Sequence, residues 1–116
     1  WSLSTVATAL SEADVAIGPL DDTAYARGKC AYKLLQYAAT GLPMVARPVG
    51  ANALALERFD GVAVAVGGDW TEALEAVITE SAARREARGR QGIAAVAEHY
   101  SFEAWSPHWR AAVLGS

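Results

Sequence analysis

The stretch GKCAYKLLQYAATGLPMVARPVG, residues 28–50, holds the helix and the strand that decide the fold. Apolar side chains recur at helical spacing over residues 29–40, and Gly41 followed by Pro43 is typical of a helix C-terminus. The continuous apolar run in residues 43–49 predicts a strand that is buried on both faces. A helix followed at once by such a strand indicates an α/β unit.

The flanking sequence continues this alternation of helices and strands. Further strands are expected in residues 14–20 and 62–66, and a polar loop in residues 21–28. Further helices are expected over residues 2–13, 52–58, 81–99 and 102–114, with one more after Asp69, a capping residue. Strands that alternate with helices are joined by right-handed crossovers and lie parallel. The fold class predicted is therefore α/β, a Rossmann-like parallel sheet of about three strands flanked by helices.

Length, composition and charge narrow the function classes. The chain has 116 residues, which suits one domain or a piece of a larger one, and its net charge of -3 argues against a nucleic-acid binder. No apolar stretch approaches the roughly 20 residues that span a membrane. The single Cys30 rules out an internal disulfide and fits a reducing compartment. A start at Trp1 and so few strands predict a fragment of a longer domain.

The start of the central helix is a candidate anion site. Gly28 allows close approach of a ligand to the backbone, and free N–H groups of Lys29, Cys30 and Ala31 would lie at the positive end of the helix dipole. Lys33 adds a second positive charge nearby. A phosphate or diphosphate fits this pattern. An equally weighted alternative is that Gly28 is only a turn residue and both lysines are solvated.

Other polar residues have weaker cases for function. For Asp21 and Asp22, solvation of the loop is favoured over contact with a sugar hydroxyl, and for Cys30 buried packing is favoured over nucleophilic chemistry. His99 and His108 lack metal-ligand spacing, so surface or packing roles are expected and no metal site is predicted.

An arginine cluster occupies the expected helix at residues 81–99. Its members are Arg84, Arg85, Arg88 and Arg90, between Glu80 and Glu86. A solvated helix face is the favoured interpretation, and an anionic membrane surface the minor one.

Four segments together resemble a known family. The segments ADVAIGPL (13–20) and GKCAYKLLQYAATGLPMVARPVGAN (28–52) resemble the nucleotide-sugar-binding core of retaining GT-B glycosyltransferases of the "group 1", or family 4-like, type. GDWTEALEAV (68–77) and HYSFEAW (99–105) are similar to the downstream helices of that domain. The resemblance implies that residues 1–116 form the C-terminal half of a donor-binding domain.

The family pattern also implies roles for particular positions. Its two glutamates, eight residues apart, fall at Gly28 and Gln36 here. The second glutamate holds the ribose hydroxyls in the family, a role that Gln36 could fill as a neutral hydrogen-bonding group. The first region contacts the sugar and diphosphate, where Gly28 leaves only backbone N–H groups. The resemblance implies no metal or other cofactor, and a nucleotide-diphosphate sugar as substrate.

These observations define the function expected from the sequence. It is nucleotide-diphosphate-sugar binding within a retaining glycosyltransferase of the hexosyltransferase type, whose catalytic residues are not identified in this chain. The family's arginine–lysine pair and its acceptor-binding domain would lie upstream, so the isolated chain is expected to be inactive. The alternatives are a non-catalytic α/β nucleotide-binding or regulatory module, and a structural fragment without a ligand.

The sequence also predicts where the protein is located and how it assembles. A cytoplasmic protein is expected, with peripheral contact at the inner face of the membrane as a further expectation for the full protein. The strand in residues 14–20 would be left as an open sheet edge, and edges of this kind pair with other chains. A homodimer joined through this edge or through the first helix is therefore expected. The base, the sugar and the acceptor are not defined by the sequence.

Overall fold

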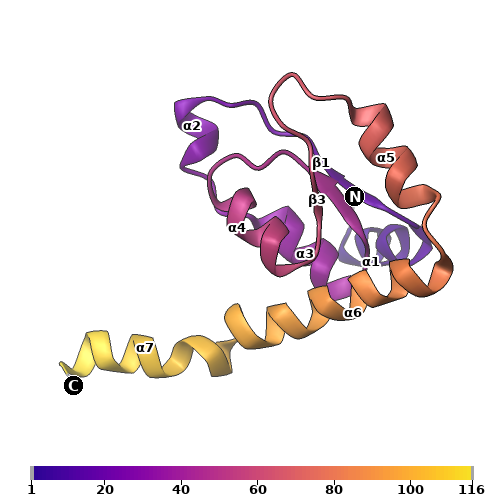
Figure 1. Ribbon diagram of the computed structural model, residues 1–116. Coiled ribbons are helices and arrows are strands. Elements are labelled where there is room, and N and C mark those ends of the chain that lie inside the picture. Colours follow the sequence, from indigo (N-terminus) through magenta and orange to yellow (C-terminus); the bar gives the residue numbers. More distant parts are fainter. Residues whose placement is uncertain (1, 116) are drawn as a thin grey trace.

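The computed structural model describes residues 2–115 and shows an α/β fold built on a three-stranded parallel sheet (Figure 1). The strands are β1 (Ala16–Gly18), β2 (Met44–Ala46) and β3 (Val62–Ala63), and they lie side by side in chain order. Both pairings are parallel, with Ala16 opposite Met44 and Val45 opposite Val62. The fold class predicted from the sequence is confirmed.

The paired strands are shorter than the apolar runs that predicted them. The run at 62–66 was expected to be one strand, but β3 ends at Ala63. The Val64 N–H still donates to the Ala46 carbonyl over 2.9 Å, so the chain stays against the sheet for one residue more. Beyond Ala63 only Val64 of this run is buried, and Val66 is 66% exposed, so the apolar run overestimates the length of the strand.

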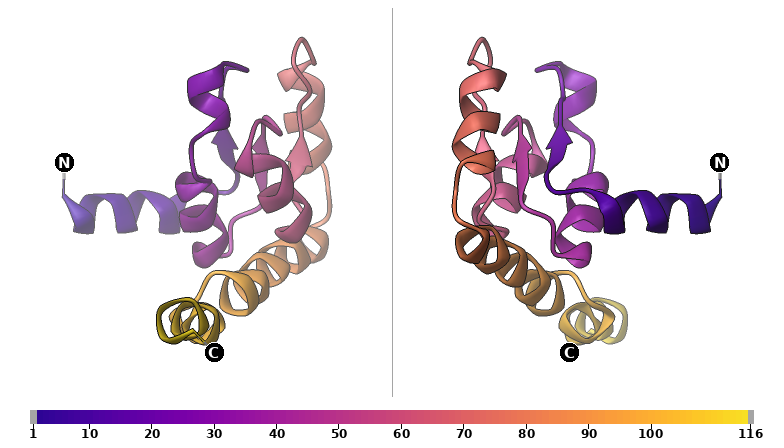
Figure 2. Two further views of the ribbon diagram at one scale, coloured as in Figure 1. Left: turned by 90° about the vertical axis from the view of Figure 1, so that its left-hand side faces the viewer. Right: turned by 90° about the vertical axis from the view of Figure 1, so that its right-hand side faces the viewer.

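Seven helices flank or extend the sheet within residues 2–115. They are α1 (Leu3–Glu12), α2 (Ala24–Arg27), α3 (Tyr32–Thr40), α4 (Ala51–Arg58), α5 (Trp70–Ile78), α6 (Ala82–His99) and α7 (Phe102–Leu114). Figure 1 shows α3 and α4 on one side of the sheet and α5 on the other, and Figure 2 shows α6 passing below the strands, opposite their carboxyl ends. The order of helices and strands matches the sequence expectation except for α2.

Helix α2 lies in residues 21–28, which were expected to be a polar loop. Thr23 caps it, because its hydroxyl accepts the Ala26 N–H at 3.1 Å. Ala26 is buried, which fixes the short helix against the body of the fold. A single helical turn has no periodicity that a sequence pattern can show, so only Thr23 could have marked it.

Two apolar clusters fill the space on the two faces of the sheet. Strand β2 contributes to both, since Met44 and Ala46 face one cluster and Val45 the other. The larger cluster joins the sheet to α3, α4 and α6, with Leu34, Ala38, Leu56 and Phe59 among its buried members. The smaller one packs Val77 of α5 against the opposite face. Burial on both faces is what the unbroken apolar run of β2 predicted.

Glycines bring α6 unusually close to the end of α3. Gly41 follows α3 in the left-handed conformation with φ 79°, and its N–H donates to the Ala38 carbonyl, as the sequence predicted for this position. A side chain built on Gly89 of α6 would overlap the Gly41 carbonyl, and one on Gly92 would lie 3.3 Å from the Ala38 Cα. The two backbones therefore pack directly on each other.

The last helix extends away from this body in Figure 1, and the first helix does so in Figure 2. Neither α1 nor α7 has a buried residue, and Leu3 and Phe102 are each more than 90% exposed, at 91% and 93%. In α1 only the region of Leu10 packs against the larger core cluster. Ser101 caps α7 as expected, and the helix continues past Pro107 to Leu114.

Candidate functional site

A cavity of about 460 Å³ opens at the carboxyl end of β1. Its lining comes from the end of β1, from the segment that leads into α3, and from the start of α4. The lining residues are Gly18, Pro19, Leu20, Lys29, Cys30, Ala31, Tyr32, Lys33, Leu34 and Asn52. Open parallel sheets bind ligands outside the carboxyl ends of their strands, so this is the position where a ligand is expected.

A second hollow, of about 590 Å³, lies at the other end of β1. It is larger, but it is lined by Asp14, Arg85 and apolar side chains. Its lining comes from the segment before β1, from the second half of α5 and from the first turn of α6, where Arg85 already donates to two backbone carbonyls. The smaller cavity is the better candidate for a ligand site, both in its position at the sheet and in the side chains that line it.

The helix beside the cavity begins later than the sequence suggested. The sequence placed Gly28 and Lys29 at the start of α3, whereas Gly28 is the C-cap of α2 and α3 begins at Tyr32. The Lys29 N–H is already used, because it donates to the Ala26 carbonyl over 3.1 Å. The free N–H groups at the start of α3 are instead those of its first turn, Tyr32 to Leu34. The N-terminus that faces the cavity is thus shifted by about one turn of chain.

Both predicted lysines line the cavity, and both are exposed. The Lys29 ammonium lies 5.1 Å from the centre of the Tyr25 ring, which positions it without neutralising it. Within residues 2–115, neither Lys29 nor Lys33 forms an ion pair with a carboxylate. Two unneutralised positive charges and a helix N-terminus therefore share one cavity.

Four predicted residues lie outside the cavity lining: Gly28, Gln36, Asp21 and Asp22. Gln36 is half-buried one turn further along α3, and its amide Nε2 lies 3.4 Å from the hydroxyl of Tyr32, a lining residue. Asp22 accepts a hydrogen bond from Arg27 Nε at 2.6 Å. This bond, more than the charge of Arg27, lowers the pKa of the Asp22 carboxyl below its usual value. Asp22 is thus paired rather than simply solvated, whereas the Asp21 side chain is exposed.

Cys30 is exposed at the cavity wall, so the expectation of buried packing is wrong. The helical pattern of residues 29–40 placed Cys30 on the helix, but the residue precedes α3. Because α3 begins only at Tyr32, its inward face is the one that carries the buried residues Leu34 and Ala38.

Asn52 is a lining residue that the sequence analysis did not single out. It lies in the first turn of α4, and it is the one buried polar residue of the described chain, with 8% of its surface exposed. Its backbone N–H donates to the Val49 carbonyl over 3.1 Å. The available signal was its place just after the apolar run of β2, at a strand end that faces the ligand edge of the sheet.

The frame of the cavity includes a direct contact between two stretches of backbone. Gly50 precedes α4 with φ 56°, a conformation that favours glycine. A side chain built on it would lie 2.6 Å from the Arg27 carbonyl oxygen, so only glycine fits there. The backbone at the end of α2 therefore contacts the backbone at the start of α4, and the lining residues lie beside this contact.

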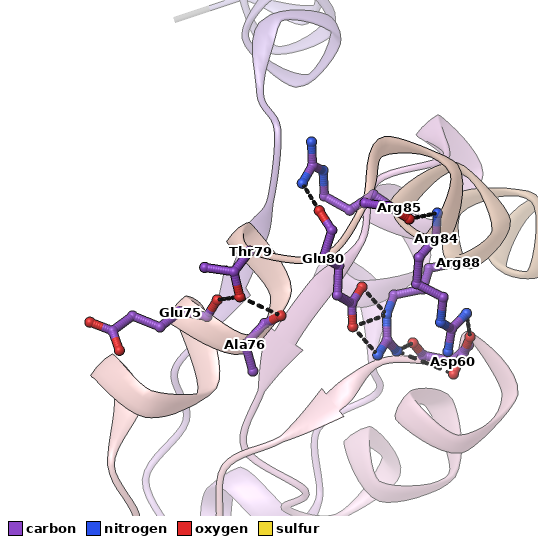
Figure 3. A network of polar contacts seen from close by, with 9 residues as sticks. Asp60, Glu75, Ala76, Thr79, Glu80, Arg84, Arg85 and Arg88 are labelled. Atoms are coloured by element: carbon purple, nitrogen blue, oxygen red, sulfur yellow. Dashed lines mark hydrogen bonds and ion pairs between the residues drawn. The ribbon is translucent and has the colours of Figure 1, made fainter.

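Part of the arginine cluster forms a polar network (Figure 3), and the expectation of a solvated face is wrong for Arg88, whose side chain is 12% exposed. Arg88 donates from Nε and Nη2 to the Glu80 carboxylate, at 2.9 and 2.7 Å, and from Nη1 to the Asp60 carboxylate at 3.2 Å. Arg84 also pairs with Asp60, and Arg85 donates to two backbone carbonyls. Arg84, with 45% of its side chain exposed, and Arg90, with 70%, match the expectation of a solvated face.

This network has little capacity left for an anionic surface. Three of the four arginines use their guanidinium groups on carboxylates or carbonyls of the same fold. The hydrogen bond with Arg88 lowers the pKa of Glu80, which keeps the pair charged at neutral pH. The network fixes α6 to the turn between α4 and β3.

The described residues offer no metal site and no membrane span. No group of three or more histidine, cysteine or acidic side chains in residues 2–115 could hold a metal ion. None of the helices in that range is long and apolar enough to cross a bilayer. His99 lies 3.7 Å from Glu98, and His108 packs on the ring of Trp105.

No similarity of the whole chain to known proteins was found. Comparisons with protein-family models, with curated proteins and with solved structures gave no match.

Proposed function

We propose that the cavity at the end of β1 binds the diphosphate of a nucleotide-diphosphate sugar, as the donor site of a retaining glycosyltransferase. The observation that carries the proposal is the meeting of Lys29, Lys33 and the N-terminus of α3 at the carboxyl edge of a parallel sheet. Each of these features favours an anion, and helix N-termini of this kind bind phosphate groups. In transfer chemistry the same positive groups would stabilise the departing nucleoside diphosphate without a metal.

The ribose is assigned in this proposal to Gln36. Its side chain lies one helical turn from Tyr32, so a nucleotide whose diphosphate sits in the cavity can extend along α3. An amide offers both a donor and an acceptor, which suits a pair of hydroxyls. Asp21 and Asp22 are assigned no more than an outer position, since Asp22 is already bonded to Arg27. The proposal keeps a cytoplasmic location and peripheral membrane contact for the full protein.

The test is calorimetric titration of the chain with UDP, GDP, ADP and their glucose or mannose conjugates. Because two charges contact the diphosphate, Lys29→Ala/Lys33→Ala is expected to weaken binding by about 10- to 30-fold. Backbone amide shifts on titration should cluster at residues 29–34 and 18–20. The control is Arg90→Ala/Arg110→Ala, which removes two exposed cations outside the cavity lining. Absence of binding by every nucleotide, or shifts confined to α6, would contradict the proposal.

The alternative function is a non-catalytic α/β nucleotide-binding or regulatory module. The described lining of the cavity favours it in one respect, since it contains no carboxylate that could act as an acid, a base or a nucleophile. A module of this kind would bind a nucleoside diphosphate as tightly as its sugar conjugate. The same titrations therefore separate the two functions.

For assembly, we propose a homodimer that pairs two copies through the free edge of β1. In the described sheet β1 has a partner on one side only, and Ile17 is 48% exposed there. Light scattering at tens of micromolar is expected to report twice the mass of the chain. Ile17→Lys should shift the mass toward the monomer, because charged residues protect sheet edges. Val66→Lys is the control, at an exposed position after β3. A monomeric wild-type chain would refute the dimer.

A further inference from the structure

We propose that Asn52 binds the hydroxyl groups of the sugar that is attached to the diphosphate. This inference rests on the proposed function and adds to it a residue that selects the sugar part of the ligand. Asn52 is buried and its side chain has no hydrogen-bond partner in the described part of the chain, a combination that none of the other lining residues shares.

The side-chain amide of Asn52 is almost completely buried at the wall of the cavity. With 8% of its surface exposed, Asn52 is more than nine-tenths buried. No hydrogen bond within residues 2–115 involves its side chain, yet that range has no fully buried side-chain nitrogen or oxygen without a partner. The amide atoms must therefore be what remains accessible, and the residue lines the cavity. Water or a ligand in the cavity is their available partner.

The fold does not need this amide for its own stability. At helix starts, asparagine usually caps the helix with its side chain, but Gly50 is the N-cap of α4. The Asn52 backbone N–H is satisfied by the Val49 carbonyl. Alanine would form the helix better, and it would remove the unpaired polar group. The amide is therefore best explained by something that enters the cavity.

The chemistry of the amide favours hydroxyl groups over phosphate. A phosphate oxygen only accepts hydrogen bonds, so it could accept from the Asn52 amide nitrogen but would leave the carbonyl oxygen without a donor. A sugar hydroxyl both donates and accepts, and a pair of neighbouring hydroxyls can satisfy both ends of the amide. The cavity thus has two regions: positive charge from Lys29, Lys33 and the α3 N-terminus, and a neutral donor–acceptor group at Asn52.

The rest of the lining leaves few other groups for a sugar. It contains neither aspartate nor glutamate, and the Tyr32 hydroxyl already accepts a hydrogen bond from Gln36. The Asn52 carbonyl is therefore the main side-chain acceptor that faces the cavity. Sugar hydroxyls without an acceptor would lose hydrogen bonds that they make with water.

The experiment compares each nucleoside diphosphate with its sugar conjugate: UDP with UDP-glucose, GDP with GDP-mannose, and ADP with ADP-glucose. Dissociation constants are measured by calorimetry for the wild-type chain, Asn52→Ala and Asn52→Leu. The leucine variant keeps the number and branching of the side-chain heavy atoms but cannot form hydrogen bonds. Gln91→Ala is the control, because it removes an amide that bonds to the Arg58 carbonyl outside the cavity. Thermal unfolding of each variant checks the fold.

We expect both Asn52 variants to bind the sugar conjugate about 10-fold more weakly, the effect of losing two neutral hydrogen bonds. Affinity for the diphosphate alone should change less than about twofold. Equal losses for both ligands would place Asn52 at the phosphate and overturn the inference, as would unchanged affinities. Either of those results leaves nucleotide binding itself intact. Failure of the wild-type chain to bind any nucleotide would instead refute the proposed function and this inference with it.

Discussion

Gly89→Val is expected to destabilise the fold by about 3 to 5 kcal/mol, or to prevent folding altogether. A Cβ at this position overlaps the Gly41 carbonyl, which belongs to rigid backbone and cannot rotate away. Helix α6 would have to separate from α3. That movement would uncover Ala38 and Ala95, which are at most 2% exposed in the native fold.

The measurement is the free energy of unfolding from urea denaturation followed by circular dichroism. Ala83→Val is the matched control, since it adds the same β-branched side chain to the same helix at an exposed position. That control should cost only a few tenths of a kcal/mol, the difference in helix propensity. Similar stability losses in both variants would show that the close packing of α3 and α6 is not what limits the size of residue 89.

Arg88→Ala is expected to destabilise the protein by about 2 to 3 kcal/mol. The Arg88 side chain is 12% exposed and its partner Glu80 20%, so removing the guanidinium leaves a partly buried carboxylate without a partner. Arg88 also donates to the Asp60 carbonyl over 2.5 Å, and Asp60 has φ 53°, an uncommon conformation for a residue other than glycine. The variant therefore loses both an ion pair and a support for this turn.

The effect of Arg88→Ala should depend on pH. The hydrogen bond from Arg88 lowers the pKa of Glu80 below its usual 4.5 in the folded state. A lowered folded pKa stabilises the protein above the unfolded value, and that contribution is lost as the pH falls through the folded value. The stability difference between wild type and variant should thus be full at pH 7 and shrink below about pH 4. Arg90→Ala, whose partner lies 3.9 Å away in solvent, should change little at any pH. A pH-independent loss would contradict this account.

The sequence predicted the architecture well because apolar runs and helix-capping residues can be recognised even where the strands are short. The apolar run of β2 is buried on two faces, and Asp69 and Ser101 cap α5 and α7 as expected. These features depend on local chemistry, so they can be read from neighbouring residues. The observed order β1-β2-β3 agrees with the general tendency of consecutive strands to lie side by side.

The details of the site were harder to predict because they depend on the residue at which each helix begins. Apolar spacing placed the start of α3 at Lys29, but α2 continues to Arg27 and its last turn occupies the Lys29 N–H. Buried packing was expected for Cys30 because free cysteines are usually buried, but its place before α3 leaves it exposed. The exposure of side chains near a helix start follows from such boundaries, which periodicity locates only within a few residues.

The burial and the bonding partners that tertiary contacts define could not be read from neighbouring residues. Asn52 is buried by packing of α4 against distant segments, and Arg88 finds Asp60 28 residues away in the sequence. A run of arginines on a helix looks solvated until its partners are known. The network and the cavity wall thus required the three-dimensional structure.

The contact between Gly50 and the Arg27 carbonyl has a consequence for how this architecture can vary. It is made by backbone atoms, so the spacing of the two walls does not depend on which side chains line the space between them. Side chains such as Asn52 and Lys33 can be exchanged without moving the frame. The fold is therefore a good starting scaffold for redesign, in which recognition is altered by substitution at the lining while the glycine is kept.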